Sequence, residues 1–154
     1  MEYRVLVIAP GSTSTKVYVC KDGEKIIEET ITYSSTCTSK YSKIYDQFQF
    51  RKEDVLRVLR EKNFDLNTLD AIVGRGGLLD LAKDEIYRVN ELMINDLKSG
   101  TQGEHASNLG AIIAYSIANP LKIPAFTVNS VTIDELQDIA RISGLAEIKR
   151  RSIV

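Results

Sequence analysis

The segment 3–33 constrains the fold of this chain most, because it has the pattern of three consecutive β-strands joined by short turns. The run 3–8 is almost entirely apolar, as in a strand covered on both faces, and a Pro-Gly pair follows it closely. Strand-forming residues resume over 16–20, and after the turn sequence KDG they return over 24–33. Connections this short join antiparallel neighbours, so we expect three antiparallel strands at the start of the domain.

The remainder of the chain alternates between helical and strand patterns. Val55 and Leu59 stand at helical spacing, and the short apolar run AIVG predicts a buried strand. Asn119-Pro120 is expected to stop a strongly apolar helix, and Gly144 a last one. The predicted elements are helix 42–62, strand 71–74, helix 104–118, strand 123–128 and helix 130–144. This order favours an α/β domain with a mixed five-stranded sheet and helices on both faces.

Length and composition favour one globular domain over residues 1–154. Of the 154 residues, 44% are hydrophobic and 27% charged, and the formal net charge is -1, so neither disorder nor nucleic-acid binding is expected. Cys20 and Cys37 lack a metal-binding spacing and His105 is the only histidine, so we expect no metal site on them. No run approaches the roughly 18 apolar residues of a membrane span, and we expect a soluble cytoplasmic protein without a membrane partner.

The turn between the first two strands carries the most distinctive polar residues. The sequence GSTSTK at 11–16 places four hydroxyl side chains directly before a lysine. Successive backbone N–H groups, hydroxyls and a cation can together surround a phosphate. The sequence is not a Walker A loop, because the second glycine before the lysine is missing and a strand follows. The alternative is an ordinary hairpin whose hydroxyls satisfy their own backbone.

Four segments together resemble one enzyme family. They are PGSTSTK at 10–16, RGGLL at 75–79, LKSGTQGEHASNLGAIIA at 97–114 and ARISG at 140–144. In this order they resemble the butyrate kinases, which belong with the acetate kinases to the superfamily of sugar kinases and actin. The resemblance runs from residue 5 to about residue 153 and implies a domain with the ribonuclease H-like, actin-like ATPase fold.

The resemblance also implies an activity and its ligands. Members of the family close two duplicated domains over ATP, Mg²⁺ and a short-chain carboxylate, and they transfer the γ-phosphoryl group to make an acyl phosphate. This chain resembles the first domain only, and nothing like the adenosine-binding second domain follows in it. We therefore expect the N-terminal domain of a butyrate kinase-like phosphotransferase that is inactive or weak by itself. Whether it acts as an enzyme and retains ATP stays open.

The resemblance, together with the residues themselves, provides a candidate site. By resemblance, His105 faces the transferring phosphoryl group, and position 129 is a further catalytic candidate. Arg75 directly follows a buried strand, where a guanidinium can clamp a carboxylate; the alternative is a structural ion pair. Glu104 and Asn108 flank the histidine and are expected only to cap or orient it. The phosphate-binding candidates are Gly11, Ser12, Thr13, Ser14, Thr15 and Lys16, together with position 9.

Two positions depart from the family pattern. Where the family has an asparagine that helps to position the Mg-bound phosphate, this chain has Ala9. Where the family has an aspartate, it has Asn129, which cannot accept a proton or balance Mg²⁺ with charge. Loss of one preorganised polar group can cost about 10²–10³ in rate. Asp134 and Glu135 fall inside the expected last helix, and we interpret them as solvated charges rather than replacements.

Two other functions are consistent with parts of the sequence. The domain could stand alone without catalysis and form a homodimer, and the apolar helical run 109–118 motivates this hypothesis. A ribonuclease H-type nuclease is disfavoured, because its metal-binding carboxylate belongs on the first strand, where Ala9 and its neighbours are uncharged. The expected partners are a nucleotide and a short-chain carboxylate, with either a complementing C-terminal domain or a second copy of the chain.

Overall fold

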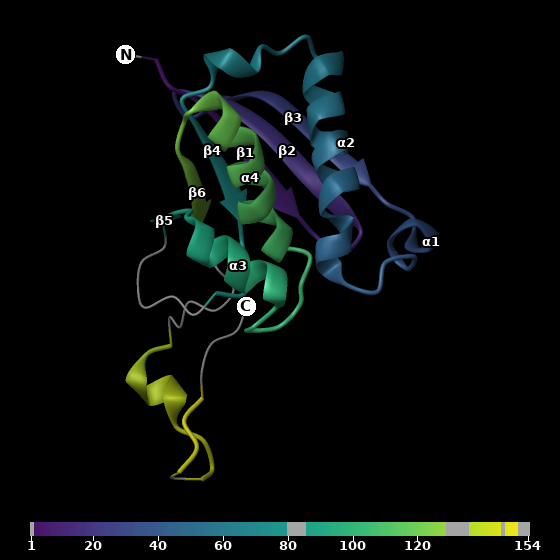
Figure 1. The fold of residues 1–154 in the computed structure, drawn as a ribbon. Helices are drawn as coiled ribbons and strands as arrows, with labels where there is room; N and C mark the ends of the chain where they lie inside the picture. The colour runs from purple at the N-terminus through teal and green to yellow at the C-terminus, as the bar shows by residue number, and fades with distance from the viewer. Residues whose placement is uncertain (1, 80–85, 129–135, 146, 151–154) are drawn as a thin grey trace.

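The computed structural model describes residues 2–79, 86–128, 136–145 and 147–150. As predicted, the domain opens with three antiparallel strands, which a two-residue turn and a short hydroxyl-rich turn connect (Figure 1). These strands are β1 (Arg4–Pro10), β2 (Ser14–Lys21) and β3 (Glu24–Thr32). The hydroxyl-rich turn therefore lies at the carboxyl-terminal end of β1.

The sheet has six strands in the order β3-β2-β1-β4-β6-β5, whereas five were predicted. β4 (Ala71–Arg75) pairs in parallel with both β1 and β6 (Ala125–Val128), and the additional strand β5 (Ile86–Arg88) pairs antiparallel with β6 at the edge. Three residues are too few to show the alternation that marks a strand in sequence, which is why β5 was missed. The parallel pairing brings the carboxyl ends of β1, β4 and β6 to the same edge of the sheet, the edge formed by the ends of these strands.

The two predicted central helices are present with shifted bounds. α2 (Phe48–Glu61) follows the 3₁₀ turn η1 (Ile44–Gln47), and α4 (Asn108–Leu121) begins later than expected. α4 also continues through Pro120, so the prediction that Asn119-Pro120 stops it was wrong. The proline lies in the last turn, where it removes a single N–H donor, and the burial of α4 against the sheet outweighs that loss.

Two further helices were not predicted, α1 (Ser35–Thr38) and α3 (Glu91–Ser99). α3 is short but capped at both ends: Asn90 Oδ1 accepts a hydrogen bond from Met93 N at 2.9 Å, and Gly100 ends it in the left-handed conformation. A 3₁₀ turn, η2 (Leu66–Thr68), leads into β4. Among the described residues, no helix is both long and apolar enough to cross a bilayer.

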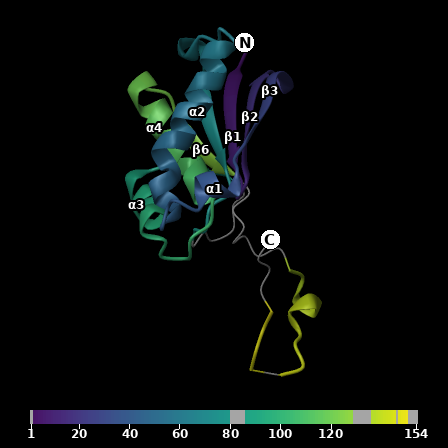
Figure 2. The same ribbon diagram turned by 90° about the vertical axis from the view of Figure 1, so that its right-hand side faces the viewer.

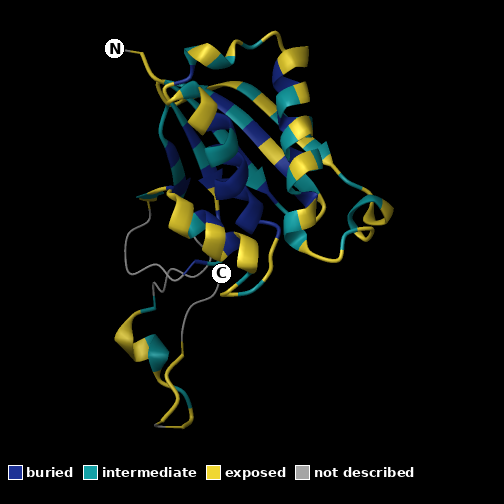
Figure 3. Cartoon of the chain, viewed as in Figure 1, coloured by how far each residue is buried: buried dark blue, intermediate teal, exposed yellow. Residues whose placement is uncertain are grey.

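Helices α2, α3 and α4 all lie on one face of the sheet, as the two views in Figures 1 and 2 show. α4 packs directly against β1, β4 and β6, and the core between these layers is buried (Figure 3). Its largest members are Leu6, Ile8, Val17, Val19, Val55, Leu59, Ile72, Leu109 and Ile113. Over the described residues, the opposite face of the sheet has no comparable helical layer, so the structure does not show the expected helices on both faces.

The last predicted helix, 130–144, also differs from the structure where the chain is described. The helical structure in residues 136–144 is limited to the 3₁₀ turn η3 (Asp138–Arg141), and Figure 1 shows this segment away from the sheet. Ile139 and Ile142 are 77% and 70% exposed. Because most of the stability of a protein helix comes from packing an apolar face, these residues do not stabilise a longer helix here.

Candidate anion site at the edge of the sheet

A cleft of about 250 Å³ opens between the β1–β2 turn, the end of β4 and the segment that leads into α4. It gathers candidate residues that are distant in sequence. The topology explains this grouping, because the strand pairing sets Ala9 opposite Lys16 and Ile8 opposite Gly74. The lining residues are Ala9, Pro10, Gly11, Ser14, Lys16, Arg75, Gly76, His105 and Ser107.

Three of the phosphate-binding candidates do not line this cleft. Ser12 and Thr13 are exposed on the turn beside it. Thr15 is fully buried, and its hydroxyl accepts hydrogen bonds from the Tyr33 hydroxyl at 3.1 Å and from the Arg51 guanidinium at 3.2 Å. The structure therefore places Thr15 where it holds the turn from the inside and cannot contact a ligand in the cleft.

The remaining catalytic candidate, Asn129, lies outside the described residues, as do Asp134 and Glu135. The strand that precedes it is described: Val128 is the last residue of β6, and its carbonyl oxygen accepts a hydrogen bond from Gly76 N at 2.8 Å. Since Gly76 lines the cleft, β6 ends beside the candidate site.

The cleft carries positive charge. Lys16 and Arg75 both line it, and among the residues that the structure describes no carboxylate does. In the part of the chain that the structure describes, neither side chain forms an ion pair. The alternative interpretation of Arg75 as a structural ion-pair partner thus finds no acid among these residues. Two unpaired cations at one small cleft favour an anionic ligand.

His105 adds a directional donor to these charges. The backbone N–H of Ser107 donates to His105 Nδ1 at 3.2 Å, and Ser107 Oγ lies 2.8 Å from the same atom. Because a backbone N–H can only donate, Nδ1 is the acceptor, and the neutral ring carries its proton on Nε2. The ring is thereby oriented with Nε2–H as the hydrogen-bond donor. His105 lies in the turn that leads into α4 rather than in the helix itself.

The β1–β2 turn directs its backbone carbonyl groups toward protein donors. Gly11 N donates to Ser14 O at 2.7 Å, and Tyr33 N donates to Thr13 O at 2.8 Å. The side chain of Arg51, from α2, donates to the other two carbonyls of the turn at 2.8 and 3.3 Å. Among the described residues, the two central N–H groups of the turn have no partner, so they remain available to solvent or to a ligand.

Close backbone packing positions the opposite wall of the cleft. Gly74 and Gly110 bring β4 and α4 into contact, and a Cβ on Gly74 would overlap the backbone of Gly110. Gly76 has a φ of 87°, and a Cβ there would lie 2.7 Å from Ser107 Cβ. Only glycine fits these two requirements of space and conformation. The guanidinium and imidazole of the cleft are therefore carried by two elements that touch through their backbones.

Two residues at the site were missed in the sequence. Ser107, which orients His105, stands two positions after it, a spacing that allows a local side-chain to backbone contact. Arg51 is fully buried on the face of α2 that also carries Val55 and Leu59. An arginine one turn before an apolar residue, on the apolar stripe of a predicted helix, was the available signal.

The side chains of Glu104 and Asn108 form hydrogen bonds to neighbouring segments rather than to the histidine. Asn108 Oδ1 accepts from Leu78 N, and Asn108 Nδ2 donates to Gly103 O, both at 2.9 Å. Glu104 Oε2 accepts from Ile44 N at 3.3 Å. These hydrogen bonds tie together the loops around the cleft, which is a structural role.

Solved structures share the fold of this domain. The chain is similar to an acetate kinase from Porphyromonas gingivalis with a TM-score of 0.63 at 14% identity, over 98% of this chain and 45% of that one. A propionate kinase from Francisella tularensis matches with a TM-score of 0.56 at 15% identity, over 93% of this chain and 41% of that one. The domain has the actin-like ATPase fold of these kinases.

The sequence comparison narrows the class to one family. The chain is 53% identical over 152 residues to a probable butyrate kinase from Clostridium botulinum, and this match covers 99% of the chain but 43% of that protein. It is 51% identical over 153 residues to butyrate kinase 2 from Clostridium acetobutylicum, with the same coverage. The chain therefore corresponds to an N-terminal part of a butyrate kinase and spans less than half the length of these relatives. No family model matches the sequence.

Proposed function

We propose that this domain is the phosphoryl-binding half of a carboxylate kinase that converts ATP and a short-chain carboxylate such as butyrate into an acyl phosphate and ADP. The observation that carries the proposal is the cleft at the sheet edge, where Lys16, Arg75 and His105 converge and where no carboxylate stands among the described lining residues. Phosphorylation of a carboxylate joins two anions, so such a site needs positive charge and hydrogen-bond donors above all. The similarity to butyrate kinases supports the choice of acceptor.

The proposed reaction moves one phosphoryl group. A carboxylate oxygen attacks the γ-phosphorus, the bond between that phosphorus and the oxygen bridging to the β-phosphate breaks, and ADP leaves with the electron pair. Arg75 holds the attacking carboxylate, while Lys16 and the turn N–H groups bind phosphoryl oxygens. The Nε2–H group of His105 donates to the oxygen on which charge builds in the transition state.

The described residues of this domain do not by themselves fit a magnesium site. Among them, no carboxylate lines the cleft, and no group of three or more His, Cys, Asp or Glu side chains could hold a metal ion. Ala9, which has no polar atom beyond its backbone, lines the cleft at the position where the family pattern has an amide. We therefore expect the domain alone to be inactive or weak.

Complementation tests the proposal. We would mix this chain with the separately produced remainder of butyrate kinase 2, add ATP, Mg²⁺ and butyrate, and trap acyl phosphate with hydroxylamine. The mixture is expected to form the hydroxamate, and neither part alone is expected to do so efficiently. His105→Ala should reduce the rate by about 10²-fold, because it removes the donor to the developing charge.

The matched control is Lys25→Ala, which removes an exposed cation that pairs with Glu28 on β3, far from the cleft in sequence and on the sheet. Its rate should equal that of the unchanged chain. A folded, associated mixture that forms no hydroxamate, or that loses as much activity with the control as with His105→Ala, would contradict the proposed function.

A homodimer is the second candidate arrangement, and exposed apolar side chains near the end of the described chain favour it. Ile139, Ile142, Leu145 and Ile148 are between 55% and 77% exposed. Burial of such residues against a second copy would remove apolar surface from water. Sedimentation equilibrium with and without ATP and Mg²⁺ tests this arrangement: a dimer is expected, and a monomer at high concentration under both conditions would exclude it.

A further inference from the structure

Arg51 is a fully buried cation whose acceptors are all uncharged. It extends from the buried face of α2 to the inner side of the β1–β2 turn, and among the described residues it forms no ion pair. Its acceptors are the carbonyl oxygens of Gly11 (2.8 Å), Ser12 (3.3 Å) and Ser14 (3.4 Å), the Thr15 hydroxyl (3.2 Å) and the Gln47 side chain.

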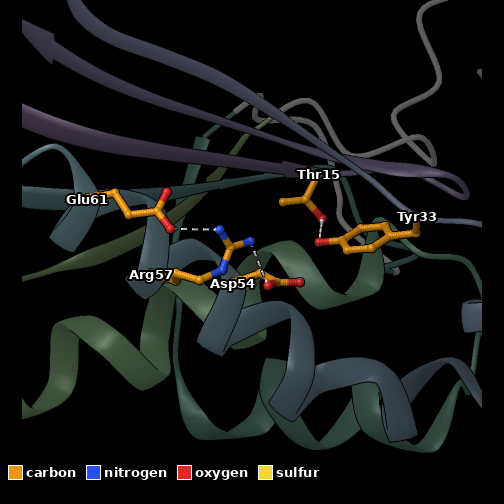
Figure 4. Close-up of polar contacts among 5 residues, drawn as sticks. All are labelled: Thr15, Tyr33, Asp54, Arg57 and Glu61. Atoms are coloured by element: carbon orange, nitrogen blue, oxygen red, sulfur yellow. Dashed lines mark hydrogen bonds and ion pairs between the residues drawn. The ribbon is translucent and has the colours of Figure 1, made fainter.

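The guanidinium is fixed in orientation by groups outside the turn. Gln47 Oε1 accepts from Arg51 Nε at 3.1 Å and from Nη2 at 2.8 Å. The Tyr33 ring lies against the guanidinium, with its centroid 4.5 Å from Cζ. Tyr33 also donates through its hydroxyl to Thr15, the contact drawn in Figure 4. The planar set of N–H donors on the Arg51 guanidinium is therefore held in one orientation before any ligand binds.

This arrangement determines which way the turn presents its backbone. The carbonyl oxygens of Gly11 and Ser12 face Arg51, and that of Thr13 accepts from Tyr33 N. The N–H groups of Ser12 and Thr13 have no partner among the described residues, and both residues are exposed. A turn whose carbonyls are bound on one side can offer its N–H groups on the other, which is the geometry that binds phosphate oxygens.

In the part of the chain that the structure describes, no acidic side chain compensates the charge of Arg51. Burial lowers its pKa below the ordinary value, but an arginine side chain stays protonated in proteins. A buried charge without a counter-ion is costly unless it is hydrogen-bonded or neutralised. A phosphate on the outer side of the β1–β2 turn would neutralise the charge of Arg51 from the other side of the turn backbone.

We propose that Arg51 is a positioning residue for anion binding: it holds the carbonyls of the turn inward, so that the N–H groups of Ser12 and Thr13 and the cleft beside them receive a phosphate. Arg51 does not itself contact the ligand. The inference rests on the proposed function, because it assigns a role at the same anion site.

Binding of inorganic tripolyphosphate to the chain, measured by calorimetry, tests this role. Arg51→Lys keeps a cation but loses the planar fork, so it is expected to bind roughly tenfold more weakly than the unchanged chain, and Arg51→Met more weakly still. Arg57→Met is the matched control on the same helix. Arg57 is half exposed and bonded at 3.0 Å to both Asp54 and Glu61 (Figure 4), so its loss should leave the affinity unchanged.

The amide resonances of Ser12 and Thr13 provide a readout that a merely structural role would not move. Tripolyphosphate should shift them in ¹⁵N spectra of the unchanged chain and of Arg57→Met, and this shift should be lost in Arg51→Lys while the rest of the spectrum stays folded. If Arg51 variants fail to fold, Gln47→Leu frees the guanidinium while keeping it, and it should weaken binding several-fold.

The outcomes separate the two proposals. No binding of tripolyphosphate to the unchanged chain would overturn the anion site and, with it, the role of Arg51. Binding to the unchanged chain with equal affinity in folded Arg51→Lys or in Gln47→Leu would overturn the role of Arg51 alone. Equal weakening in Arg57→Met would also overturn it, because the effect would then be one of total charge.

Discussion

The two turns that enclose the cleft are held in place by opposite means. The β1–β2 turn is held by side chains, since Arg51 and Thr15 form hydrogen bonds beneath it. The second turn, here the end of β4 together with the residues that follow it, is held by the absence of side chains, since Gly74 and Gly76 allow backbone to meet α4 and its lead-in. A substitution at the first turn can remove one hydrogen bond and leave the others in place. At the second turn, a side-chain atom added at Gly74 would overlap the packed backbone. Substitutions at the second turn should therefore act first on stability, and those at the first turn on binding.

The largest effect is expected at the second turn. Gly74→Ala would place a methyl group into the backbone of Gly110, and we expect a loss of about 3 kcal/mol in the free energy of unfolding, because α4 cannot move away without uncovering the core. Urea unfolding followed by circular dichroism measures it. Gly144→Ala is the control, since a Cβ there meets nothing within 4 Å. If both variants were equally stable, backbone contact would not be what holds this wall.

A smaller effect is expected at the first turn. Thr15→Val keeps the shape and strand preference of the residue but cannot accept from Tyr33 or Arg51, so it should cost about 1–1.5 kcal/mol of unfolding free energy. Thr30→Val, at an exposed position of β3, should change stability by less than about 0.5 kcal/mol. Urea denaturation of both variants checks this difference, and a loss at Thr15 no greater than at Thr30 would contradict it.

The smallest effect should appear only at alkaline pH. Burial raises the pKa of the Tyr33 phenol, while its hydrogen bond to Thr15 and the charge of Arg51 oppose this shift. The fold thus favours the neutral phenol, so its contribution to stability is complete below the unfolded pKa of about 10 and is lost as the pH rises through the folded pKa.

Tyr33→Phe lacks this titration. The stability difference between the unchanged chain and Tyr33→Phe should therefore shrink as the pH rises above about 10, as measured by urea unfolding at each pH. Tyr18→Phe, a change at a partly buried tyrosine of the open sheet face, serves as the comparison. Parallel stability curves for the unchanged chain and Tyr33→Phe would show that the phenol is not held neutral by the fold.

Local sequence patterns were sufficient to predict the elements with clear periodicity. They were insufficient for the short elements and for the segment whose apolar side chains are exposed. The three opening strands, α2 and α4 follow from alternation and helical spacing in the sequence. β5 and α3 were missed, because three residues show no period and a nine-residue helix depends on its caps and packing. Residues 136–144 belong to the predicted last helix, but Ile139 and Ile142 lie exposed in the structure.

The residues of the candidate site also differ in whether the sequence was sufficient to predict their role. The hydroxyl turn, Arg75 and His105 were found from motifs, and the structure brings them to one cleft. Thr15 belongs to the same motif but faces the core, because successive residues of a strand point to opposite faces and Thr15 shares the inner face with Val17. Ser107 and Arg51 were missed, since their roles depend on contacts that periodicity does not encode.

The sequence by itself determined the opening strands, the chemistry available at the first turn and the resemblance to butyrate kinases, because each is written in local residue order. Only the tertiary structure decided that Lys16, Arg75 and His105 share one cleft and that Arg51 lies beneath the turn. Those outcomes depend on strand pairing and on the approach of α2 and α4 to the sheet. Contacts between residues distant in the chain are set by how the whole core packs, and no local pattern specifies them.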